Sequence, residues 1–216
     1  RDFDRCRELL SQIREKVSLD IPGNKQYMID LEASLDLKEE IISKEEFAER
    51  EEEALQCTLN TEKLFYSDQI YLTEMEMLCI SKKIRGVEDT EKIKYIDFLL
   101  HFFETYEKKC KLSDCISMYE FVMIYVVNEL GNMGKYQFAI DLDKKVLKED
   151  LLCRRTWLIS NILYDIMWNK VKQGIESRKS LEKIKMTEEL EQCILLSHFC
   201  RQTFYEEFYK SKLIQS

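Results

Sequence analysis

The stretch from Leu130 to Ile140 constrains the fold of this chain more than any other. A helical pattern of apolar residues runs into it, and a second such pattern leaves it. Glycine has no Cβ, so Gly131 and Gly134 allow the backbone to reverse sharply between the two helices. The small side chain of Ala139 lets the two helices approach each other closely. The stretch therefore predicts two antiparallel helices joined by a tight turn.

Its pattern, Leu-Gly-x-x-Gly-x-Tyr-x-x-Ala-Ile, resembles the centre of a tetratricopeptide repeat. Such a repeat is a helix-turn-helix unit of about 34 residues, and successive units stack into a superhelix. The resemblance implies an all-α fold, a right-handed superhelix of stacked antiparallel helix hairpins. The alternative is an ordinary helical hairpin with two convenient glycines.

The scarcity of glycine and proline also favours helices. The 216 residues include five glycines and one proline, well below the average usage of about 7% and 5%. Sheets need tight turns, and tight turns need these residues. We expect a single helical-repeat domain over residues 1–216, with N-terminal helices over 1–60 and tetratricopeptide-like hairpins and a C-terminal helix over 72–216.

Apolar residues spaced three and four apart predict the individual helices. Two capping boxes, Ser43 with Glu46 and Thr73 with Glu76, mark helix starts where side chains satisfy free backbone donors. Gly86 is expected to end the second of these helices. The predicted helices cover approximately residues 3–17, 27–37, 44–55, 74–85, 90–106, 114–130, 136–147 and 154–172, a short helix 176–184, and a long last helix 187–213.

The net charge is −8, with acids and bases mixed along the chain. This argues against nucleic-acid binding by the segment itself, because phosphate contacts need clustered lysine and arginine. The acidic group is interpreted as a solvated helix surface, and each basic group as a solvated helix surface or as a favourable charge near a helix C-terminus. These groups are Glu45, Glu46, Glu49, Glu51, Glu52 and Glu53; Lys82, Lys83 and Arg85; and Lys144, Lys145, Lys148, Arg154 and Arg155.

The eight cysteines show no paired metal-ligand spacing, and the chain has only two histidines, His101 and His198. We expect reduced, core-type thiols of a cytoplasmic protein, without a metal site or a cofactor. No nucleophile with its base and no phosphate-binding glycine loop is visible, so no catalytic residue and no enzyme activity are expected. No apolar run approaches the length of a membrane span, so we expect no membrane partner.

Several segments together resemble one family. They are Ile42–Phe47, Glu53–Thr58, Leu72–Glu76, Leu130–Ile140 and Arg154–Trp157. They resemble the C-terminal sensor of Gram-positive helix-turn-helix transcription regulators of the Rgg and PlcR type. In that family a DNA-binding domain precedes a tetratricopeptide-like superhelix, which dimerises and, in characterised members, binds a short signalling peptide. The other repeats of this chain are degenerate and it contains no DNA-binding domain, so DNA contact is expected only through a domain upstream of Arg1.

The resemblance implies a concave groove lined by the first helix of each hairpin. Asn161 follows Asn128 by 33 positions (161 − 128), close to one repeat. Each amide offers a donor and an acceptor, so it can clamp an extended peptide backbone. The alternative is that these amides cap turns or bond neighbouring helices. The predicted peptide-binding residues are Phe121, Ile124, Tyr125, Asn128, Asn132, Asn161, Tyr164 and Asp165.

Two functions stay open at this point. The first is a peptide-sensing and dimerisation domain of a cytoplasmic transcription regulator acting in quorum sensing. The second is a tetratricopeptide-type protein-interaction scaffold without a small-peptide ligand. The predicted last helix carries apolar residues on more than one side, which predicts a homodimer through the C-terminal helices.

Overall fold

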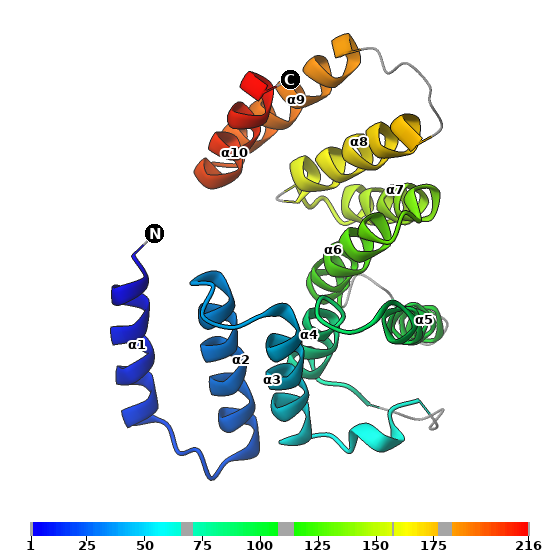
Figure 1. Cartoon of the computed structure of the whole chain (residues 1–216). Coiled ribbons are helices and arrows are strands. Elements are labelled where there is room, and N and C mark those ends of the chain that lie inside the picture. Colours follow the sequence, from blue (N-terminus) through cyan, green and yellow to red (C-terminus); the bar gives the residue numbers. More distant parts are fainter. Residues whose placement is uncertain (1, 66–70, 108–114, 157, 177–182, 216) are drawn as a thin grey trace. The chain divides into compact units, whose positions relative to one another are not determined.

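A computed structural model describes residues 2–65, 71–107, 115–156, 158–176 and 183–215 of the chain (Figure 1). Over these residues the backbone forms ten α-helices and one short 3₁₀ helix, and no strand. The predicted all-α class is therefore confirmed. The chain divides into two compact units, Arg1–Tyr106 and Glu107–Ser216, called here the N-terminal and the C-terminal unit. The predicted single domain over 1–216 stays a prediction.

The N-terminal unit is a series of helices that pack on their neighbours in the chain: α1 on α2, α2 on α3 and α3 on α4. Pro22 opens α2, where its missing N–H costs nothing because the first turn has no carbonyl partner for it. The helices are α1 (Phe3–Lys16), α2 (Pro22–Lys38), α3 (Lys44–Gln56), η1 (Thr61–Lys63), α4 (Glu74–Lys83) and α5 (Asp89–Glu107, its last residue belonging to the C-terminal unit).

Both predicted capping boxes are confirmed. The Ser43 hydroxyl accepts the backbone N–H of Glu46 at 3.1 Å, and the Glu46 carboxylate accepts the N–H of Ser43 at 2.8 Å. Thr73 and Glu76 repeat this arrangement at the start of α4. Gly86 lies beyond the end of α4 and has a different role from the one predicted. A Cβ on it would lie 1.8 Å from the carbonyl oxygen of Lys44, so glycine is needed for this close approach to α3.

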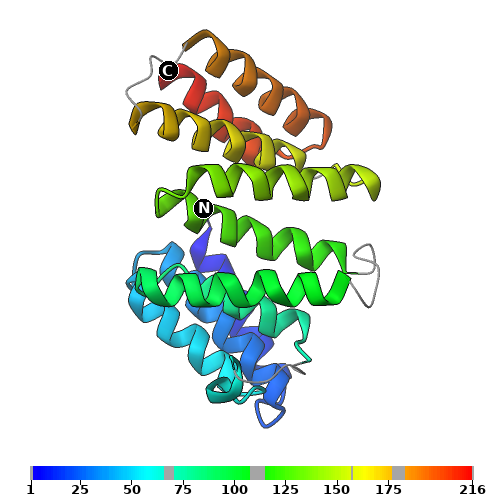
Figure 2. The ribbon, with the colours of Figure 1, turned by 90° about the vertical axis from the view of Figure 1, so that its right-hand side faces the viewer.

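The C-terminal unit consists of α6 (Ile116–Asn132), α7 (Tyr136–Leu152), α8 (Ile159–Glu176), α9 (Lys183–Phe199) and α10 (Thr203–Gln215). Each helix packs on the next, and α6 also contacts α8 directly. Figure 2 shows these helices from a second side, running in order from green to red. Alternate helices thus touch within this unit, as expected for successive hairpins.

The central turn joins α6 to α7 as predicted. Gly134 has a φ of +73°, and Lys135 N–H reaches back to the carbonyl of Leu130 at 2.8 Å, which closes α6 in a Schellman motif. Gly131 was wrongly assigned to the turn, because it lies inside α6. A Cβ on Gly131 would lie 2.6 Å from the side-chain oxygen of Asn169, so its role is to let α8 pack closely on α6.

The helices near the C-terminus differ from the predicted ones. Helix α8 continues through Gly174 to Glu176, and α9 begins at Lys183. The predicted short helix 176–184 falls mainly on residues 177–182, which lie outside the described part. The long last helix is instead a hairpin of α9 and α10. The chain reverses at Arg201, whose φ is +55°. An arginine in this left-handed conformation gives no sequence signal of a turn.

Candidate functional site

All eight predicted peptide-binding residues lie on two neighbouring helices of the C-terminal unit. Helix α6 carries the first five and α8 the other three, and the two helices contact each other. Each of the eight side chains is exposed or half-buried, and Phe121 is 40% exposed. The set therefore belongs to the accessible surface of the unit and not to its core.

Helix α6 has two faces of different burial. One face is core, and its fully or nearly fully buried members are Tyr119, Val122, Met123, Val126, Val127 and Leu130. The other face bears Phe121, Ile124 and Tyr125, with Asn128 exposed one turn further along. At the end of the helix, the amide of Asn132 donates to the Glu129 carboxylate at 3.2 Å, so Asn132 interacts within its own helix.

The residues of α8 interact with α10. The Tyr209 hydroxyl donates to the side-chain oxygen of Asn161 at 3.3 Å. The Tyr164 ring lies 5.4 Å from the ring of Phe208 and 5.2 Å from that of Tyr209, between centroids. Asn161 was interpreted either as a peptide clamp or as a residue that caps a turn or bonds a neighbouring helix. Its side-chain oxygen does bond another helix, α10. Within the described residues its NH₂ group makes no hydrogen bond.

Two aspartates of the C-terminal unit, the buried Asp143 and the half-buried Asp165, have raised pKa values. Burial and the charge of Asp165 raise the pKa of Asp143 on α7 to about 9, and burial raises the pKa of Asp165 itself to about 7. Asp143 is only 3% exposed, and its Oδ2 atom has no hydrogen-bond partner in the described part. At neutral pH Asp143 is therefore protonated, and Asp165 carries only part of a negative charge.

Two further buried acids, Glu120 of α6 and Asp150 of α7, lie near the end of α7. Arg155 donates from Nε to the buried carboxylate of Glu120 at 2.7 Å, which ties the segment after α7 to α6. Burial, together with Glu120, raises the pKa of Asp150 to about 8. Arg155 is half-buried and follows the end of α7, so of the two interpretations of this basic group, a charge near a helix C-terminus holds for it.

In the N-terminal unit, part of the predicted acidic surface is core. Glu51 is completely buried on α3. It follows Phe47 by four residues and precedes Leu55 by four, so it falls on the apolar stripe of the helix. That spacing was the available signal, but the acidic neighbours of Glu51 concealed it.

Of the basic residues at the end of α4, Lys83 is buried and Lys82 is half-buried. Lys82 forms an ion pair with Asp30 on α2. Lys83 donates to the Glu52 carboxylate at 2.8 Å and to the Tyr95 hydroxyl at 2.6 Å. The prediction that Glu52 lies on a solvated surface was therefore wrong. For the two lysines, the alternative of a charge near a helix C-terminus holds, because both lie in the last turn of α4, where they pair with acids distant in the sequence.

Two hollows of the described surface lie elsewhere. One, between α1, α2 and α3, is lined by Arg7, Leu10, Ser11, Arg14, Glu32, Asp36 and Arg50. The other, on α7, is lined by Lys144, Leu147, Lys148, Leu151 and Leu152. Neither includes any of the eight predicted peptide-binding residues.

None of the helices in the described ranges combines the length and the apolar character needed to cross a membrane. In comparisons with known proteins, no family model, no curated protein and no solved structure matches this chain. The resemblance to Rgg and PlcR sensors stays a prediction, and its Trp157 lies outside the described residues.

Proposed function

We propose that this chain is the peptide-binding and dimerisation domain of a cytoplasmic transcription regulator, whose DNA contacts are made by another domain. The proposal is supported above all by the accessible surface of α6 and α8, two helices in contact that present aromatic and amide side chains outward. Amides can bond the backbone of an extended peptide, and aromatic rings can receive its apolar side chains.

The contacts of Asn161 supply a route from this surface to the end of the chain. Its oxygen accepts from Tyr209 of α10. A peptide N–H that bonds the same oxygen competes with Tyr209, so peptide binding would favour a different placement of α10. A ligand shifts a conformational equilibrium only through such a difference in contacts between two states.

Peptide binding is tested by thermal unfolding of the chain with short hydrophobic peptides. A ligand that binds only the folded state stabilises it by about 2.7 kcal/mol at one hundred times its Kd. We expect Asn128→Ala and Phe121→Ala to lose this stabilisation. Phe138→Ala is the matched control, because Phe138 is 47% exposed on α7, outside the predicted surface. If all three variants respond like the wild type, the surface of α6 and α8 does not bind the peptide.

The dimerisation part rests on exposed apolar side chains around the turn between α9 and α10. Leu195, Phe199 and Phe204 are 56%, 75% and 60% exposed. Such apolar exposure is typical of an association surface. By light scattering at micromolar concentration, we expect a dimer for the wild type and a monomer for Phe199→Glu. The control Leu152→Glu changes an equally exposed residue of α7 and should remain dimeric; a monomeric wild type would refute this part.

The second candidate is a protein-interaction scaffold, and the hollow on α7 favours it. Its lining combines the apolar Leu147, Leu151 and Leu152 with the basic Lys144 and Lys148. This combination suits an acidic amphipathic segment of another protein. Binding that responds to Leu151→Ser but not to Asn128→Ala would select the scaffold over the peptide sensor.

A further inference from the structure

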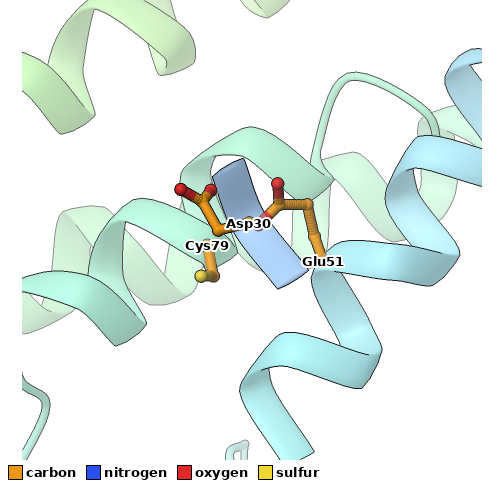
Figure 3. Close-up of side chains that lie close together, drawn as sticks. All are labelled: Asp30, Glu51 and Cys79. Carbon is orange, nitrogen blue, oxygen red and sulfur yellow. The ribbon is translucent and has the colours of Figure 1, made fainter. Parts of the chain in front are cut away.

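Three potential metal ligands meet inside the N-terminal unit. They are Asp30 from α2, Glu51 from α3 and Cys79 from α4. One carboxylate oxygen of each acid and the sulfur of Cys79 all lie within 4.8 Å of one another. Figure 3 shows the three side chains converging from separate helices.

The burial of these side chains follows from the packing of the three helices. Asp30 is 2% exposed, and Glu51 and Cys79 are fully buried. Because α3 packs on both α2 and α4, the middle of its apolar stripe faces the other two helices. The cluster is therefore part of the core of the unit, although no pair of its members is close in the sequence.

Glu51 supplies an independent sign of a missing partner. Neither of its carboxylate oxygens has a hydrogen-bond partner in the described structure, and its side chain points toward Asp30 (Figure 3). A buried polar group without a partner is costly, and each such group calls for an explanation. A cation held between the three side chains would supply that partner.

We propose that Asp30, Glu51 and Cys79 form a binding site for a divalent transition-metal ion, with Zn²⁺ as the preferred ion. Zinc accepts both thiolate and carboxylate ligands, and three protein ligands leave a fourth position for water. Calcium takes six to eight oxygen ligands, and magnesium demands an octahedron of oxygens. A thiolate with two carboxylates suits neither of them.

Lys82 balances the charge of the cluster both without and with the bound metal ion. Burial and Asp30 raise the pKa of Glu51 to about 9, and burial likewise raises that of the Cys79 thiol. Without metal, the ion pair of Lys82 and Asp30 supplies two opposite charges that cancel. Binding releases one proton from Glu51 and one from Cys79, and the Lys82 ammonium yields its place beside Asp30 to the ion. Three ligand anions, the ion and Lys82 then again sum to zero.

The site is tested by refolding the full chain in the presence of Co²⁺, which reports a thiolate ligand through a sulfur-to-cobalt charge-transfer band. We expect this band for the wild type, saturating at one ion per chain, and its loss when Zn²⁺ displaces Co²⁺. Cys79→Ser should abolish the band. Cys193→Ser is the matched control, since Cys193 is equally buried in α9 and should leave the band intact.

A second variant separates the oxygen ligand from the sulfur. Glu51→Gln should weaken Zn²⁺ binding by at least about 100-fold, because loss of even an outer-shell partner costs 10- to 100-fold. Calorimetry of the wild type in buffers of different ionisation heat should count about two protons released per ion. Far-ultraviolet circular dichroism verifies that each variant is folded. Absence of the band in the wild type, or its persistence in folded Cys79→Ser, would overturn the proposal.

Discussion

Replacement of Asp143 by asparagine should change how the stability of this protein depends on pH. Asp143 is buried on α7 and its pKa is raised from 3.8 to about 9, chiefly by burial and further by Asp165. Between these two values the folded state holds a proton that the unfolded state has lost. The stability from this proton is complete below pH 3.8 and is lost as the pH rises through about 9.

The size of the effect follows from proton linkage. When the folded state holds one more proton than the unfolded state, the free energy of unfolding falls by about 1.4 kcal/mol for each unit by which the pH rises. Between about pH 5 and about pH 8, Asp143 alone therefore lowers the free energy of unfolding by about 4 kcal/mol. Asp150, with a pKa raised to about 8, acts in the same direction.

Asparagine has a similar shape and does not ionise. Asp143→Asn should therefore remove the contribution of one proton to the slope of the unfolding free energy against pH. We expect the variant to be close to the wild type in stability near pH 5 and clearly more stable near pH 8. Urea unfolding followed by circular dichroism at several pH values measures both slopes. Asp141→Asn, an exposed position on the same helix, is the control and should retain the wild-type slope. Parallel curves for the wild type and Asp143→Asn would refute the reasoning.

Three further substitutions test the backbone and its caps by chemical unfolding. Gly86→Ala should destabilise by about 1–3 kcal/mol or more, because its Cβ would meet the Lys44 carbonyl at 1.8 Å, whereas Gly23→Ala, with nothing within 4 Å, should not. Arg154→Gly should stabilise by up to about 1 kcal/mol by relieving a left-handed φ of +55°; an unchanged or lower stability would contradict this. Ser43→Ala should cost about 1 kcal/mol through loss of its cap, and no loss would show the cap to be dispensable.

Local signals were read correctly from the sequence. Each capping box involves atoms only three residues apart, so the sequence alone identifies it. The left-handed Gly134 and the two faces of α6 are likewise encoded within a few turns of helix. The break at Arg201 was missed because a non-glycine residue takes the left-handed conformation there. The packing of α9 on α10 offsets the cost of that conformation.

Burial of charge was the main property that the sequence did not reveal. Glu51, Lys82 and Lys83 stand among other charged residues, and that composition is typical of a solvated surface. Lys82 bonds Asp30, 52 positions away, and Lys83 bonds Tyr95, 12 positions away, each on another helix. No local pattern encodes such a distance.

The sequence by itself determined the helical class, most helix starts and the position of the central hairpin, because helix formation and capping depend on neighbours within a few residues. The tertiary structure decided which charges are buried, where Gly131 and Gly86 are needed, and that Asp30, Glu51 and Cys79 meet. These properties depend on which helices pack together, and packing joins residues that the sequence separates.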